Sequence, residues 1–222
     1  MRFWRQAFTL FLRDLRMEGR SGEILGVVFP FAVVALVAVP LTTDASRNTI
    51  STLGPPVFWL ILLLLGMHVS LRNTGSESLT QRRHLALSGA DPVARFVGRS
   101  MATTVLLGGV AIACLPTMVI MYDPDSVSIA SMTVPLALFT PGLAMLTTLI
   151  GDISAGLRLR SALVPMVVAP LAIPLVVPAS QASRSLSTDG SSLAWILLLI
   201  VADLLLGIVG VLMSETIEET TL

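Results

Sequence analysis

Long apolar stretches alternate with short polar segments along most of this 222-residue chain. Six stretches approach the length of about 20 mostly apolar residues that a helix needs to cross a hydrocarbon core. They cover residues 24–41, 53–71, 101–122, 129–150, 161–179 and 193–213. The runs are continuous and do not alternate residue by residue, which predicts spanning helices and not a β-barrel. We therefore expect an all-α polytopic membrane protein whose residues 1–222 form a single membrane domain.

The composition agrees with folding in lipid. Hydrophobic residues make up 54% of the chain and charged residues only 13%, against about 25% charged residues in a typical soluble domain. A fold this apolar lacks the polar surface to cover itself in water, whereas helices in lipid satisfy their backbone groups internally. The single cysteine, Cys114, lies within an apolar stretch. We interpret it as a small buried residue, because one thiol makes neither an intramolecular disulfide nor a metal cage.

Arginines are distributed unevenly between the two sets of loops. All 14 basic residues are arginine. Two of them, Arg47 and Arg184, lie in one set of alternate loops. The other twelve lie before the first stretch, between the second and third, or between the fourth and fifth. Because basic loops stay on the cytoplasmic side, we expect both termini to be cytoplasmic.

Residues 1–22 predict an amphipathic helix that lies along the membrane surface. Its arginines fall within an arc of about 80° on a helical wheel, and the opposite side is aromatic and aliphatic. These arginines are Arg2, Arg5, Arg13, Arg16 and Arg20. Such a helix places guanidinium groups among lipid phosphates and rings at headgroup depth. The alternative is a charged cytosolic helix that packs only on its neighbours.

Two acidic residues interrupt the apolar side of this helix. Asp14 and Glu18 are spaced i,i+4 and lie among its hydrophobic residues. Since carboxylates are unfavourable against acyl chains, we expect this end of the helix to leave the lipid and contact protein.

The longest predicted cytoplasmic segment, residues 72–99, reads RNTGSESLTQRRHLALSGADPVARFVGR. Its centre favours two or three helical turns, which the sequence SGADP then interrupts. A second short helix is predicted from Pro92, with Asp91 as its cap. A helix held between two spans could transmit a push from a soluble partner to the membrane domain. The alternative is an ordinary solvated loop.

The fifth apolar stretch is rich in proline. Its prolines are Pro165, Pro170, Pro174 and Pro178. Each removes a backbone hydrogen bond from a helix interior, so we expect this span to be kinked or broken. Broken helices at mid-membrane are frequent in transporters but also occur in structural bundles.

Ionisable residues inside the predicted spans are few. Asp203 lies near the middle of the sixth stretch, where an acid costs at least about 2.5 kcal/mol on insertion scales and needs a partner or water. It is either a pathway or proton-coupling group or a helix–helix hydrogen-bonding residue. His68 lies near the inner end of the second stretch, and His84 lies among arginines in the segment 72–99. Neither histidine has the sequence surroundings of a haem ligand.

The sequence contains no motif for catalysis. It has no Gly-x-x-x-x-Gly-Lys-Ser/Thr phosphate loop, so we expect no ATP hydrolysis by this chain itself. It also has no Ser–His–Asp, HExxH or CxxC arrangement, and we predict neither catalytic residues nor a metal site. Six spans and a basic surface helix favour a permease subunit or a membrane scaffold.

Four segments are distinctive, in this order along the chain: RDLRMEGRSGEIL at residues 13–25, GPPVFWLILLLLGMHVSL at 54–71, HLALSGADPVARFVGR at 84–99 and LVPMVVAPLAIPLVVPAS at 163–180. They resemble segments of the CcmB family of haem exporter subunits. The proline spacing of the last segment is the most specific of the four. The resemblance covers nearly the whole chain.

The segment after the second stretch departs from the family pattern. Arg82 and Arg83 stand where an acidic run would end in Leu–Glu, and Gly89 stands where a proline is usual. If this segment binds an ATPase, the charges at that contact differ from those of the family.

The resemblance implies a permease of the ABC-2 type in the bacterial inner membrane. It implies a cytoplasmic coupling helix within residues 72–99, with an ATPase interface at Arg82, Arg83, His84, Leu85, Leu87, Asp91 and Arg95. The implied partners are a CcmA-like ATPase, CcmC-like and CcmD-like membrane subunits and a CcmE-like haem chaperone, with two copies of this chain. The complex would use ATP, bound by its ATPase, to release haem-loaded chaperone, so haem is cargo and no cofactor is bound directly. Membrane lipid is a further partner, and no nucleic acid is expected.

Two other functions remain open. A general ABC-2 exporter subunit for a lipid, polysaccharide or drug would share the architecture, and only the proline-spaced span and the basic segment before the first span argue against it. A passive membrane scaffold without coupling to a nucleotide is the third interpretation.

Overall fold

The structure, a computed structural model, describes residues 2–22, 24–44, 46–76, 91–122, 129–154, 160–187 and 191–219. Within these ranges the regular structure is entirely helical, which confirms the predicted all-α class. The elements are α1 (Arg2–Ser21), a π-helical segment η1 (Ile24–Val28), α2 (Phe29–Thr42), α3 (Arg47–Ser76), α5 (Pro92–Tyr122), α6 (Ile129–Ser154), α7 (Arg160–Leu171), α8 (Ile173–Ser187) and α9 (Leu193–Glu219).

Each predicted span lies in an apolar helix. Four helices are long and apolar enough to cross a membrane, and α7 with α8 makes a fifth if the bent pair counts as one span. The first predicted span corresponds to a shorter apolar helix over Gly26–Thr42. A polytopic membrane fold is therefore established, and the count of six spans stays a prediction.

The helix predicted to start at Pro92 is not a short separate one. Its cap is present, because the Val93 N–H donates to Oδ1 of Asp91 over 2.9 Å. The helix then continues without a break through the third predicted span to Tyr122. No residue between Phe96 and Thr104 ends the helix, because the single glycine there costs only about 1 kcal/mol. The end of the predicted coupling segment and the third predicted span thus form one continuous helix.

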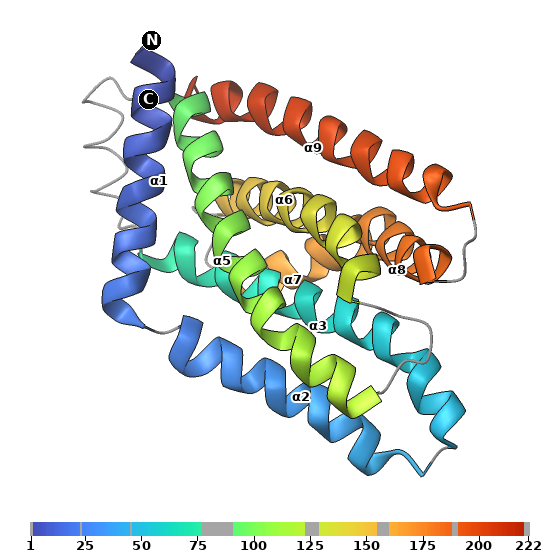
Figure 1. Cartoon of the computed structure of the whole chain (residues 1–222). Coiled ribbons are helices and arrows are strands. Elements are labelled where there is room, and N and C mark those ends of the chain that lie inside the picture. The colour runs from blue at the N-terminus through green and yellow to red at the C-terminus, as the bar shows by residue number, and fades with distance from the viewer. Residues whose placement is uncertain are drawn as a thin grey trace.

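The helices pack around α5 and α6. α5 contacts α1, α2, α3, α6 and α9, and α6 also contacts α3, α7, α8 and α9. Figure 1 shows α6 in the middle of the bundle, with α9 on one side and α3 on the other. Trp59 of α3 and Phe139 of α6 are fully buried, with ring centroids 4.9 Å apart. Such edge-to-face contact adds to the area that the rings bury.

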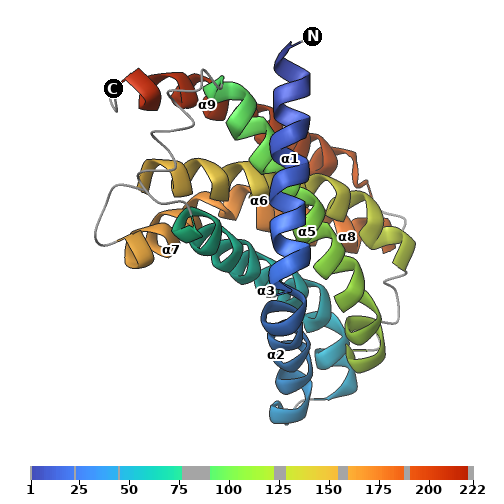
Figure 2. The same cartoon turned by 90° about the vertical axis from the view of Figure 1, so that its left-hand side faces the viewer.

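α1 crosses the bundle instead of joining it. In both views α1 stands nearly upright while α6 and α9 run across the picture (Figures 1 and 2). It packs on α5 where Ala7 meets Gly98. Trp4 and Phe8, on a neighbouring side of α1, are exposed. α1 thus keeps an exposed aromatic side, and its placement along the membrane surface stays a prediction.

The crossing of α1 and α5 depends on the missing side chain of Gly98. A Cβ atom there would lie 2.6 Å from the carbonyl oxygen of Ala7, which is backbone and has little freedom to move away. Gly98→Val should therefore destabilise the protein by about 1–3 kcal/mol, the usual cost of overpacking. The measurement is thermal unfolding of the purified protein in detergent. Gly108→Val is the matched control on the same helix, because no atom lies within 4 Å of its Cβ position. Equal stability of the two variants would contradict the proposed crossing.

Candidate functional site

α1 meets α5 and α6 at a junction of charged residues. On α1, Asp14 and Glu18 share the side that carries the fully buried Ala7. Glu18 is itself buried, and the Asp14 side chain is 16% exposed. Both acidic residues are thus shielded by the protein, as expected if this end of α1 leaves the lipid.

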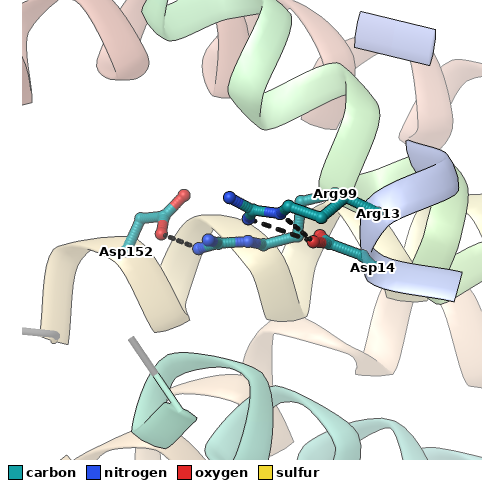
Figure 3. Close-up of polar contacts among 4 residues, drawn as sticks. All are labelled: Arg13, Asp14, Arg99 and Asp152. Carbon is teal, nitrogen blue, oxygen red and sulfur yellow. Dashed lines mark hydrogen bonds and ion pairs between the residues drawn. The ribbon is translucent and has the colours of Figure 1, made fainter. Parts of the chain in front are cut away.

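Two arginine–aspartate contacts form at this junction (Figure 3). The Nη1 atom of Arg99 donates to Oδ1 of Asp152 over 2.7 Å and so links α5 to the last turn of α6. On α1, Arg13 Nε donates to Oδ1 of the adjacent Asp14 over 3.1 Å. Figure 3 shows all four side chains where α1, α5 and α6 approach one another.

The Arg99–Asp152 pair is well placed to hold α5 and α6 together. The two side chains are 14% and 25% exposed. An ion pair shielded to this degree is screened less by water and salt than a surface pair, and its charged hydrogen bond is the stronger kind. The neighbouring residue Gly98 contacts α1. A displacement of α5 near Gly98 and Arg99 would therefore move α1 and α6 with it.

The residues predicted to contact an ATPase lie only partly within the described chain. Asp91 caps α5, and its carbonyl oxygen accepts the Arg95 N–H. Arg95 is half-buried in the first turn of the same helix. Arg82, Arg83, His84, Leu85 and Leu87 lie outside the described residues. Their role as an interface stays a prediction.

The fifth predicted span is broken, as its prolines predict. α7 ends at Leu171 and α8 begins at Ile173, and the two helices meet at an angle of 49°. Ala172 at the break is fully buried. Pro170 and Pro174 lie on either side of it and are both exposed. Pro165 lies inside α7 and Pro178 inside α8, so both helices continue through their own prolines.

Asp203 lies where α9 passes α6 and α8. Gly142 of α6 lacks a Cβ atom at the point where the Asp203 carboxylate and Leu175 of α8 approach it. The Asp203 Oδ1 atom is buried and has no hydrogen-bond partner in the part of the chain that the structure describes. Leu175 follows the break by only a few residues. The intramembrane acid and the broken span are therefore neighbours, which their separation in the sequence does not reveal.

The remaining candidates within the described residues lie apart from one another. His68 is exposed on α3, and Cys114 is buried in the core. Across the described ranges, no three His, Cys, Asp or Glu side chains lie close enough together to hold a metal ion. His84 lies outside those ranges.

Three features of the site were missed by sequence reasoning. They are the pairing of Arg99 with Asp152, the contact of Gly98 with α1 and the seating of Asp203 on Gly142. Arg99 gave a signal only as one of many basic loop residues, and Asp152 only as an acid beyond a span. A single sequence does not say which of several charged residues at helix ends become neighbours.

Comparison with known proteins gives consistent matches. The family model described as "CcmB protein" matches residues 5–215. "Heme exporter protein B" of Paracoccus denitrificans (strain Pd 1222) is 25% identical over 183 residues, covering 79% of this chain and 81% of the relative. "Heme exporter protein B" of Bradyrhizobium diazoefficiens is 24% identical over 185 residues, covering 80% of each chain.

The Arg99–Asp152 contact makes a prediction for stability. Arg99→Gln or Asp152→Asn should each lower the free energy of unfolding by about 1.5–3 kcal/mol, the range for hydrogen bonds to charged groups. The free energy of unfolding of the double variant should be little lower than that of either single variant, because both substitutions remove the same interaction. The measurement is a double-mutant cycle from unfolding in mixed micelles.

The control for this cycle is Arg5→Gln, which removes an exposed arginine of α1. Its effect should stay within about 0.5 kcal/mol. Strictly additive losses for Arg99 and Asp152 would show that the two residues act independently.

Proposed function

This chain belongs to the CcmB family, and we propose that it is a membrane permease subunit for haem export in cytochrome c maturation. The observation that carries the proposal is the family match over residues 5–215. The two relatives named heme exporter protein B support it over about four fifths of the chain. The apolar helices agree with a multi-pass membrane protein.

We further propose that the subunit works within an ABC-type complex in the bacterial inner membrane. A CcmA-like ATPase would bind and hydrolyse ATP, since this sequence has no phosphate-binding loop. CcmC-like and CcmD-like subunits and two copies of this chain would complete the membrane part. The complex would release a haem-loaded, CcmE-like chaperone, with haem as cargo. The arginine distribution supports cytoplasmic termini, and hence an ATPase on the side where α1 lies.

The continuity of α5 supports a simple coupling mechanism. A force applied by the ATPase to residues 72–99 would act on α5, whose helix begins at Pro92 and runs unbroken through the membrane to Tyr122. At Gly98 and Arg99 the same helix is tied to α1 and α6. In this proposal α1, α5 and α6 move together as one body when the ATPase changes state.

The break between α7 and α8 would supply the freedom to move. Pro174 has no backbone N–H to continue the hydrogen-bond ladder through the break. Leu175 and Asp203 lie against Gly142 of α6 just beyond it. A shift of α6 would thus reach α8 and α9 at a place where the backbone is already interrupted. Asp203 would hold α9 against α6 through its close packing on Gly142.

The test of the proposed function is a pull-down of the tagged chain from native membranes in mild detergent. We expect an ATPase together with CcmC-like and CcmE-like proteins. The Leu85→Asp, Leu87→Asp double variant should recover at least about tenfold less ATPase, because it places charge in the apolar part of the predicted interface. A tenfold loss corresponds to about 1.4 kcal/mol of binding free energy.

The matched control is Thr80→Asp, which adds charge to the same segment at a polar position. Unchanged recovery of the ATPase with the leucine variant would contradict the coupling interface. Recovery of an ATPase without any cytochrome c assembly factor would support a permease subunit but change its proposed function to that of a general exporter.

The proposed role of Asp203 gives a second expectation. Asp203→Asn should leave both the protein level and cytochrome c assembly near normal, because the amide keeps the shape of the side chain that packs against Gly142. Gly142→Val should lower the protein level, since its Cβ would collide with Asp203 and Leu175. Immunoblotting and covalent haem staining of c-type cytochromes measure the two quantities. If the Asp203→Asn variant is present at a normal level but cytochrome c assembly is lost, the carboxyl group belongs to the transport pathway instead.

A further inference from the structure

A half-open apolar cavity lies between α5, α6 and α9, beneath the surface helix. Its volume is about 330 Å³, within the range of small-molecule sites. Phe11 of α1 lies over it, and Pro141 and Met145 of α6 and Gly207 of α9 form part of its wall. No charged side chain belongs to its lining. The cavity exists partly because α9 carries no side chain at Gly207.

The cavity opens toward the hydrocarbon. Met101 and Val105 of α5 line it and are themselves 39% and 51% exposed. On a spanning helix, that exposure means contact with acyl chains. Phe11 stacks near the exposed Phe8, with ring centroids 5.7 Å apart. The cavity therefore begins where an aromatic surface helix marks the headgroup boundary.

One polar atom in the cavity wall lacks a partner. Ser100 belongs to the cavity lining, and its hydroxyl is buried and makes no hydrogen bond within the described structure. Ser100 is 4% exposed and lies at the inner end of the predicted span 101–122. In the predicted placement of this span, that end lies near the depth of phospholipid ester groups. A buried hydroxyl without a partner is costly, so an acceptor from outside the chain would satisfy it.

We propose that this cavity holds one acyl chain of a phospholipid from the leaflet on which α1 lies. The chain passes Met101 and Val105, ends near Pro141 and Gly207, and its ester carbonyl accepts the Ser100 hydroxyl. The apolar lining and the lateral opening favour this occupant. Haem would bring two carboxylates into a cavity without a cation and without an imidazole. The proposal rests on the membrane placement of α1 and not on the proposed role in haem export.

The experiment uses the full-length protein in lipid nanodiscs with a phospholipid that carries a diazirine in its acyl chain. After illumination, labelled residues are identified by mass spectrometry. We expect Met101, Val105 and Met145 to be labelled more strongly than Ile112 and Ile120, which are also exposed on α5 but lie outside the cavity.

Gly207→Phe fills the cavity with little strain, because its Cβ would lie 3.7 Å from the sulfur of Met145. It should lower labelling in the cavity at least about tenfold. Gly109→Phe, at an exposed glycine of α5 with open space around it, should change nothing. Ser100→Ala, which leaves the fold undisturbed, should weaken labelling while keeping its pattern.

Two results would overturn the proposal. The first is cavity labelling no stronger than at Ile112, or unchanged in both Gly207→Phe and Ser100→Ala. The second is protection of the cavity by added haem, accompanied by a Soret band that Gly207→Phe removes, which would make haem the occupant.

Discussion

In hydrocarbon, every backbone N–H and C=O must find its partner inside the protein, because no water is present to replace it. This constraint explains why the described chain is helical throughout its membrane part. It also explains how hydroxyl side chains are accommodated in buried helices. Thr140, Thr147 and Ser183 each donate to the carbonyl four residues earlier. The places where the constraint is relaxed are few, and they are where polar groups and cavities gather.

The first such place is the junction of α1, α5 and α6, which the predicted topology puts at the headgroup boundary, where charge is tolerated. There the protein joins the three helices through a close backbone contact at Gly98 and an ion pair between Arg99 and Asp152. The second is the proline-broken span. Just beyond the break, Leu175 lies against Gly142 of α6 together with the Asp203 carboxylate. The bundle thus has a stiff junction at one end of α5 and α6 and an interrupted helix further along, a combination that lets a movement at the surface reach the interior.

Much of this could be predicted from hydrophobicity and local chemistry. The apolar stretches, the amphipathic first helix, the Asp91 cap and the break in the fifth span all follow from rules that act over a few residues. The sequence predicts only a short helix after the Asp91 cap, although no proline follows Pro92 before Pro116. The contacts of Gly98, Gly142 and Asp152 depend on which helices become neighbours. Apolar helices of similar composition give no such information, since lipid and protein are almost equally good surroundings for leucine.

That last point bears on how α9 is held. Most of its surface faces outward, with Leu197, Leu204 and Leu212 more than half exposed. It has little hydrophobic reason to stay against the bundle, because association of spans rests on packing and polar contacts. Gly207 and Gly210 bring it close, the latter against the ring of Phe96, but Gly207 leaves the cavity beside it. An acyl chain in that cavity would supply the missing packing between α5 and α9. Asp203 lies one turn from Gly207 on the same face of α9, so lipid and the Asp203–Gly142 contact would together keep α9 in place while α6 moves.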